Sequence, residues 1–181
     1  MTSITGLVLA AGAGSRAGGP KALSRRPDGT PWVEHAVELL DACDRVIVVL
    51  GAAAAEARQL VPPHAEIVVA EDWQSGMSGS LRAGIAAASG DAALVTLVDL
   101  PDLPTSVVSR VLAGVVTPAS LRQAVFDGRP GHPVLIGANH WDALAVGLSG
   151  DRGARGYLVA HGVVEVECAD LSDGLDVDHR V

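Results

Sequence analysis

Three charged side chains in this sequence are of types that could act together on a phosphate. Lys21 is the only lysine in the chain, and it closes a glycine-rich loop that also contains Arg16. Glycines can turn successive backbone N–H groups into a concavity that attracts an anion, and a compact ammonium beside it suggests a point contact with a phosphate. Asp99 follows an apolar run of strand length, and a carboxylate is a ligand type that Mg²⁺ prefers. We therefore predict a phosphate site that binds Mg²⁺; the alternatives are an ordinary surface loop and an aspartate that only caps a turn.

The loop between residues 12 and 21 fits one type of phosphate-binding loop better than two others. Residues 12–17 match the dinucleotide fingerprint G-x-G-x-x-A, but that fingerprint needs a helix that starts within it and an acidic residue at the end of the next strand. Here Gly18-Gly19-Pro20 interrupts any such helix, and the next predicted strand ends at Gly51. A P-loop needs Gly-Lys followed by Ser or Thr, whereas Pro20 precedes the lysine and Ala22 follows it. What remains is a longer glycine loop ending in a lysine, as in nucleotidyltransferases that wrap a nucleoside triphosphate.

The composition indicates one domain. The chain has 181 residues, 49% of them apolar and only 3% aromatic, so a core of Ala, Val, Leu and Ile is expected. A net charge of −8 argues against a nucleic-acid surface, although a small phosphorylated ligand in a local basic pocket remains compatible. Cys43 and Cys168 lack metal-type spacing and predict reduced cysteines in or near the core. Because we find neither a signal-peptide pattern nor an apolar stretch long enough to span a bilayer, we expect a cytoplasmic protein with no membrane partner.

Apolar runs of strand length alternate with helical patterns along the chain. This alternation predicts an α/β fold with a doubly wound, mostly parallel sheet and helices on both faces. We expect strands at residues 4–10, 45–50, 65–70, 92–98, 121–126 and 163–168, a hairpin return at 128–137, and helices at 31–42, 52–60, 78–89, 104–114, 139–148 and 155–161. In the first helix Thr30 is the expected N-cap. A seam at 114–120 is expected to separate a nucleotide-binding half, about 1–115, from an acceptor-binding half, about 116–181.

Three further segments have residue types that could bind ligands. Ser78 is expected to cap the helix after a polar, glycine-rich stretch, and its first turn could face a ribose, base or phosphate or could be only a capped helix. His132 lies in a turn between glycine and proline, where a lone histidine is more often structural than catalytic. The loop 149–155 contains two arginines, which suggests an anionic acceptor or a solvated helix start. Asp176 and Asp178, two residues apart in the tail, would share one face of an extended segment.

The sequence resembles a known family over nearly its whole length. The matching blocks occur in the family order at residues 9–16, 20–23, 76–84, 99–101, 131–135, 150–155 and 176–178. On these blocks the chain resembles the molybdenum cofactor nucleotidyltransferases of the MobA-like NTP transferase superfamily, most closely the cytidylyltransferase branch. The resemblance implies a Rossmann-like sheet with a nucleotide in the first half and molybdopterin toward the second. The family pattern is interrupted after Asp178, where His179-Arg180-Val181 stand in place of its usual Thr-Pro-Glu-Asp.

The resemblance also implies roles for individual residues. The implied catalytic residues are Arg16, Lys21 and Asp99, of which the two basic residues would hold the triphosphate. The implied metal site binds Mg²⁺ through Asp99, with Asp176 or Asp178 from the tail. The implied nucleotide-binding residues are Leu9, Ala10, Ala11, Gly12, Ala13, Gly14, Ser15, Arg16, Lys21, Gly76, Ser78, Ser80 and Leu81. The implied acceptor-binding residues are His132, Asp151, Arg152 and Arg155.

The expected reaction needs charge neutralisation more than a general base. A terminal phosphate of molybdopterin or molybdenum cofactor would attack the α-phosphorus of the nucleotide, with pyrophosphate leaving; this nucleophile is already ionised near neutral pH. The pair Ala10-Ala11 is similar to the cytidylyl branch and favours CTP over GTP. The product could pass to a molybdoenzyme or its chaperone. The alternatives are a sugar-1-phosphate or other small phosphate-monoester nucleotidyltransferase and a non-catalytic nucleotide-binding regulator.

Overall fold

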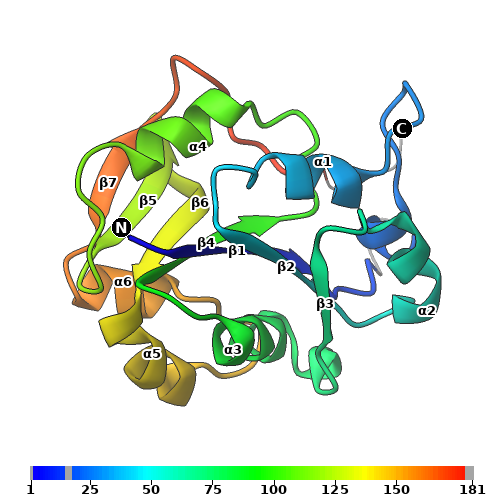
Figure 1. The fold of residues 1–181 in the computed structure, drawn as a ribbon, viewed down its shortest axis with the longest axis horizontal. Helices are drawn as coiled ribbons and strands as arrows, with labels where there is room; N and C mark the ends of the chain where they lie inside the picture. The colour runs from blue at the N-terminus through cyan, green and yellow to red at the C-terminus, as the bar shows by residue number, and fades with distance from the viewer. Residues whose placement is uncertain (1, 15–17, 178–181) are drawn as a thin grey trace.

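A single twisted sheet forms the centre of the molecule. The computed structural model describes residues 2–14 and 18–177, and it contains a seven-stranded sheet in the order β3-β2-β1-β4-β6-β5-β7 (Figure 1). The strands are β1 Ile4–Ala10, β2 Arg45–Leu50, β3 Glu66–Val69, β4 Ala92–Leu97, β5 Leu121–Phe126, β6 Arg129–Gly137 and β7 Val164–Glu167. All neighbouring pairs are parallel except those of β6 with β4 and with β5. The predicted mostly parallel sheet is confirmed, and so is the hairpin that returns through β6.

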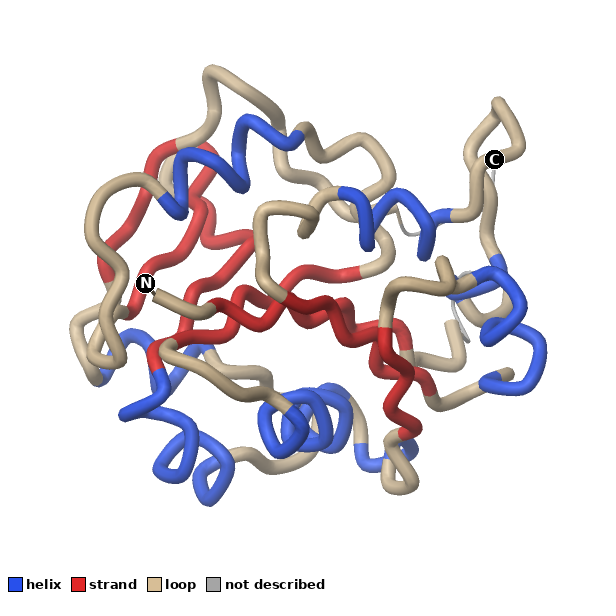
Figure 2. The backbone as a smooth tube through the Cα atoms, viewed as in Figure 1, coloured by secondary structure: helices blue, strands red, loops and turns tan. Residues whose placement is uncertain are grey.

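Helices cover both faces of the sheet, as Figure 2 shows by colour. On one face lie α1 (Trp32–Glu38) and α4 (Thr105–Leu112); on the other lie α3 (Met77–Ala87), α5 (Trp141–Gly147) and α6 (Arg155–Ala160) (Figure 1). A short α2 (Ala54–Ala57) lies near β3. Side chains of β1 alternate between two core clusters: Val8 belongs to one and Leu7 and Leu9 to the other. This alternation is what a strand covered on both faces requires, and it explains the continuous apolar run of β1.

Two predicted N-caps are wrong. Thr30 lies in a turn where its N–H donates to Asp28 Oδ1 at 2.9 Å, and α1 begins after Pro31 instead. Ser78 is inside α3 and buried, because Gly76 adopts φ 93° and ends the preceding turn, so that the helix begins at Met77. Such a backbone conformation favours glycine. Gly76 is therefore the N-cap of α3, and no side chain caps this helix.

The predicted helix over 52–60 is also wrong in part. Ala53 is left-handed at φ 55°, so the helix is confined to α2 and is followed by a 3₁₀ turn at Arg58–Leu60. A hydrogen bond explains why no helix forms at 52 and 53, because the Ala52 N–H donates to the Ala11 carbonyl at 3.0 Å, in the loop after β1.

The two cysteines, Cys43 and Cys168, are free. Cys43 is half-buried and Cys168 is buried, and burial raises the pKa of Cys43 to about 12. Within the described part of the chain, no helix is long and apolar enough to cross a membrane.

Candidate active site

The glycine-rich loop leaves β1 at the carboxyl end of the sheet and folds back on itself. Gly14 has φ 59°, and its carbonyl accepts a hydrogen bond from the Gly19 N–H at 3.0 Å. A Cβ at Gly14 would lie 1.9 Å from the Gly19 carbonyl oxygen, so this turn requires glycine twice over, for its dihedral angle and for its space. A Cβ at Gly12 would meet nothing within 4 Å, which leaves open space above that backbone. The predicted residues Ser15 and Arg16 lie outside the described residues.

Lys21 and Asp99 meet beside this loop. Lys21 begins a 3₁₀ turn, Lys21–Leu23, and its Nζ lies 2.8 Å from Asp99 Oδ2. The two side chains are 17% and 16% exposed. They come together because β1 and β4 are parallel neighbours, so the segments that follow both strands leave the same edge of the sheet. Two of the three charged residues that we expected to act together on a phosphate are therefore in contact.

The other carboxylate oxygen of Asp99 bears on metal binding. Asp99 Oδ1 is buried and accepts no hydrogen bond from any residue in 2–14 or 18–177. Buried polar atoms are rarely left without a partner, and a carboxylate oxygen of this kind suits a hard divalent cation. The tail reaches this point, since the Val177 N–H donates to the Asp99 carbonyl at 2.9 Å and Asp176 is exposed next to it. Asp178 is outside the described residues, and within those residues no group of three or more His, Cys, Asp or Glu is placed to hold a metal.

A cavity of about 220 Å³ opens between the loop and this ion pair. It is lined by Leu9, Ala10, Gly12, Gly14, Lys21, Met77, Leu97, Val98 and Asp99. Of the other predicted nucleotide-binding residues, Ala11, Ser78 and Ser80 are buried away from the cavity, Ala13 is exposed, and Gly76 packs against Asp151. Sequence reasoning missed Met77 as a lining residue, although it is partly exposed at the very start of α3.

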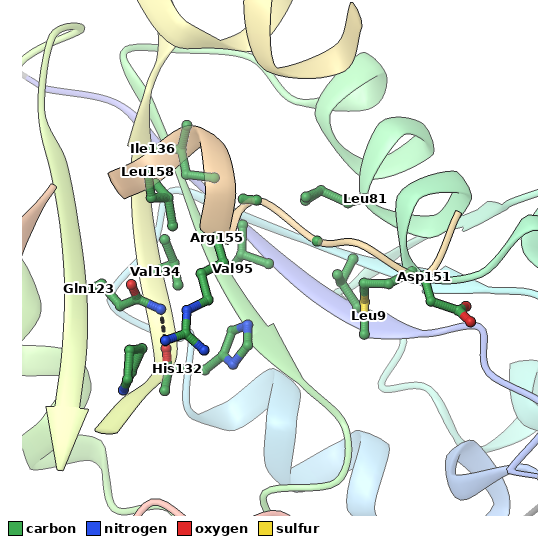
Figure 3. Close-up of a pocket in the computed structure, with 15 residues that line it drawn as sticks. Leu9, Leu81, Val95, Gln123, His132, Val134, Ile136, Asp151, Arg155 and Leu158 are labelled. Atoms are coloured by element: carbon green, nitrogen blue, oxygen red, sulfur yellow. Dashed lines mark hydrogen bonds between the residues drawn. The ribbon is translucent and has the colours of Figure 1, made fainter. Parts of the chain in front are cut away.

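A second cavity of about 260 Å³, drawn in Figure 3, shares the lining residues Leu9 and Met77 with the first. Its lining is largely apolar: Leu9, Met77, Leu81, Val95, Pro130, Gly131, Val134, Ile136, Gly153, Ala154 and Leu158. Its polar lining residues are Gln123, His132, Asp151 and Arg155. Leu81, which we predicted to contact the nucleotide, therefore lies in this second cavity.

Three polar side chains of the second cavity point toward one another. Figure 3 shows the Arg155 guanidinium reaching from the start of α6 to the space between Gln123 and His132. Gln123 Nε2 donates to the Gly131 carbonyl at 3.1 Å, which fixes the amide in place. Burial lowers the pKa of His132 to about 4, against an opposing effect of Asp176, so its ring is neutral at pH 7. Gln123 was missed from sequence, yet a buried glutamine within an apolar strand is a signal that could have identified it.

The loop between α5 and α6 lines the second cavity and is tied to the start of α3. The Ser78 N–H donates to the Gly150 carbonyl at 3.2 Å, which ties this loop to the start of α3. Arg82 strengthens the tie, because it donates to the Leu148 carbonyl at 2.7 Å and pairs with Asp72 at 3.2 Å. Of the predicted acceptor-binding residues, Arg152 alone lines neither cavity; it is exposed in this loop.

Comparison with known proteins assigns this arrangement to a family. A family model described as the MobA-like NTP transferase domain matches residues 6–166. The chain belongs to this family. Among its relatives, the molybdenum cofactor guanylyltransferase of Burkholderia vietnamiensis is 31% identical, over 93% of this chain and 87% of that protein. The nicotine blue oxidoreductase of Paenarthrobacter nicotinovorans is 42% identical, over 97% of this chain and 92% of that protein.

Solved structures agree with the fold. The crystal structure of Rv0371c from Mycobacterium tuberculosis superposes with a TM-score of 0.84 at 29% identity, covering 98% of this chain and 93% of that one. A second crystal structure of Rv0371c is a complex with manganese, with a TM-score of 0.74 at 28% identity, covering 92% and 89% of the two chains. These comparisons confirm the predicted MobA-like resemblance, the nucleotidyltransferase fold and the assignment as an enzyme. They do not decide between cytidylyl and guanylyl transfer.

Proposed function

We propose that this MobA-like enzyme transfers a nucleoside monophosphate from a nucleoside triphosphate to the terminal phosphate of molybdopterin or molybdenum cofactor, with release of pyrophosphate. The observation that carries the proposal is the ion pair of Lys21 with Asp99 beside the glycine-rich loop, on the wall of a cavity that shares the lining residues Leu9 and Met77 with a second cavity. One cavity offers charged side chains beside a glycine-rich backbone, which suits a triphosphate, and the other offers a largely apolar chamber for a second substrate.

The residues present fit a divalent cation. Asp99 Oδ1, buried and without a hydrogen bond from the described residues, would ligate it, with Asp176 or Asp178 reaching in from the tail. A bound Mg²⁺ would neutralise charge on the phosphate oxygens. The manganese complex of Rv0371c supports a divalent metal without distinguishing Mg²⁺ from Mn²⁺.

The chain itself would supply binding and orientation. The loop N–H groups and Lys21, with Arg16 from the same loop, would bind the triphosphate and neutralise the charge that develops as pyrophosphate leaves. Arg155 would orient the anionic acceptor from the second cavity. His132 would remain neutral there and offer a ring nitrogen for hydrogen bonding, since no general base is needed to activate an ionised phosphate. CTP is favoured over GTP by Ala10-Ala11, and the product would pass in the cytoplasm to a molybdoenzyme or its chaperone.

A second candidate function follows from the 42% identity to nicotine blue oxidoreductase: a redox reaction on nicotine blue or a related compound in the second cavity. Such a reaction needs a redox co-reactant, and a nicotinamide dinucleotide would have to use the glycine-rich loop. In the described residues that loop leads into the 3₁₀ turn Lys21–Leu23 rather than the α-helix that the dinucleotide fingerprint places there. This feature favours nucleotidyl transfer over the redox reaction.

The test is pyrophosphate release from CTP and from GTP, with Mg²⁺ or Mn²⁺, with and without molybdopterin. Release that requires molybdopterin is the expected result, and a preference for CTP would support the cytidylyl assignment. The matched assay follows NADH or NADPH oxidation with nicotine blue. Turnover there with no pyrophosphate release in any mixture would overturn the proposal, as would release with a sugar 1-phosphate in place of molybdopterin; CTP binding without turnover in either assay would indicate a regulator.

A further inference from the structure

A third cavity lies on the other side of the Lys21–Leu23 turn. Its volume is about 570 Å³, larger than either cavity described above, and it shares no lining residue with them. Leu23, Pro101 and Val177 form part of its wall, so it is bounded by the segments that follow Lys21 and Asp99 and by the tail. It is therefore a separate chamber beside the candidate active site.

Among the residues that the structure describes, the charged residues that line this chamber are Arg25, Arg26 and Asp102. Arg25 Nη1 donates to the Gly29 carbonyl at 2.8 Å and has no ion pair with a residue in 2–14 or 18–177. Over the same residues the Arg26 side chain makes neither a hydrogen bond nor an ion pair. Asp102 is the carboxylate on the lining and is exposed. In a chain of net charge −8, this described part of the wall therefore has more cationic than anionic residues, which favours an anionic ligand.

The charged and titratable groups near Arg26 form no ion pair with it in the described residues, so its guanidinium can bind a ligand. Asp28 lies close enough to Arg26 for their charges to interact, but its carboxylate accepts the Thr30 N–H at 2.9 Å. Burial lowers the pKa of His35, and the charge of Arg26 lowers it further, so that ring adds no further cation near neutral pH. The guanidinium of Arg26 is thus the group best placed to meet a ligand.

Apolar side chains form much of the remaining wall of this chamber. Trp32 lines the chamber at the start of α1 and is 6% exposed, with Leu23 and Val177 nearby on the lining. A volume in this range is typical of small-molecule sites that combine apolar walls with a few polar groups. An arginine beside an aromatic wall suits a carboxylate or phosphate attached to an aromatic or alkyl group.

We propose that this chamber binds a small organic anion, a phosphate monoester or carboxylate with an aromatic or apolar body, through Arg26 and the wall formed with Trp32. The site is distinct from the nucleotide and acceptor cavities, and the proposal does not depend on the proposed function.

The chain contains three tryptophans, and their indole N–H signals in ¹H–¹⁵N NMR spectra would report on three different places. Trp32 lines the chamber. Trp73 packs against Gly51 beside the loop after β1, and Trp141 donates its indole N–H to the carbonyl of Ile136, which lines the second cavity. Titration of the full chain with phenyl phosphate is expected to shift the Trp32 signal saturably and more than the other two. Benzoate in a parallel titration distinguishes a carboxylate from a phosphate ligand, and a response to either supports the site.

Three variants test the charge requirement. Arg26→Gln is expected to weaken phenyl phosphate binding about tenfold, and Asp102→Asn to strengthen it about threefold, because each changes the charge in the chamber by one in opposite directions. Arg58→Gln, at an exposed arginine outside the chamber, is the matched control and should bind like the parent. The proposal is overturned if the Trp32 signal shows no saturable shift, if only Trp73 responds, if Arg26→Gln binds as tightly as Arg58→Gln, or if neutral benzyl alcohol binds as tightly as phenyl phosphate.

Discussion

The cavity at the glycine-rich loop and the second cavity, which share Leu9 and Met77 on their walls, differ in which groups make them polar. The cavity at the glycine-rich loop has a lysine and an aspartate in direct contact, each mostly buried, beside a tight turn at Gly14. The second cavity has an apolar wall, a neutral histidine, a glutamine held by a backbone carbonyl and one arginine that reaches in from α6. The first arrangement suits binding of a highly charged group, and the second suits selection of a larger and less polar one.

The largest expected effect concerns the charged cavity. Lys21→Ala and Asp99→Ala should each lower kcat for pyrophosphate release by about 10²-fold to 10³-fold, since each removes charge stabilisation where the phosphates react. The free energy of unfolding should fall by about 1–3 kcal/mol, because the ion pair is mostly buried, so kcat is measured on variants that urea denaturation shows to be folded. Asp170→Asn, which breaks the more exposed pair of Asp170 with Arg110, is the matched control and should leave kcat unchanged. Near-parental turnover in either active-site variant would remove that residue from the catalytic set.

The shape of the loop is expected to matter next. Gly14→Ala places a Cβ in contact with the Gly19 carbonyl and a side chain at φ 59°, so the loop must shift. We expect the KM for the nucleotide to rise more than about tenfold and the free energy of unfolding to fall by about 1–3 kcal/mol. Steady-state kinetics and urea denaturation would measure the two effects. Gly147→Ala, where a Cβ would meet nothing within 4 Å, controls for the substitution itself; equal behaviour of the two variants would mean that the turn at Gly14 is not required.

Sequence reasoning located the charged cavity better than the apolar one, for a physical reason. Lys21 and Asp99 have residue types that few other roles explain, and neighbouring parallel strands bring the segments that follow them to one edge. The signals of Gln123 and Met77 are weaker, because their place in a cavity depends on β6 returning between β4 and β5 and on where α3 begins. The Ser78 cap failed for a related reason: the positive φ of Gly76 sets the helix start, and the sequence alone allowed either residue to do so.

Arg152 and Arg155 lie in the same loop, 149–155, so substitution of each compares an arginine outside the second cavity with one that lines it. Arg155→Gln should raise the KM for the acceptor about fivefold to tenfold and leave the KM for the nucleotide unchanged, because its guanidinium points into the second cavity. Arg152→Gln should leave both values within about twofold, because that exposed side chain does not line either cavity. Reversed effects of the two variants would mean that the acceptor binds outside this cavity.

The smallest expected effect tests whether the histidine of the apolar cavity is kept neutral by its surroundings. Burial lowers the pKa of His132 from an ordinary value of 6.5 to about 4, so the unfolded chain binds a proton more readily than the folded chain between these values. The contribution of this residue is therefore constant above about pH 6.5, and the free energy of unfolding falls as the pH drops from there toward 4. Between pH 7 and 5.5 the loss should be about 1 kcal/mol, measured by urea denaturation at each pH.

Two variants test this assignment. His132→Gln should remove this contribution to the pH dependence of the free energy of unfolding, whereas His64→Gln, at an exposed histidine, should retain it. If both variants keep the parental slope, His132 is protonated as readily in the folded chain as in the unfolded one, and the second cavity would then carry two cations at mildly acidic pH in place of one.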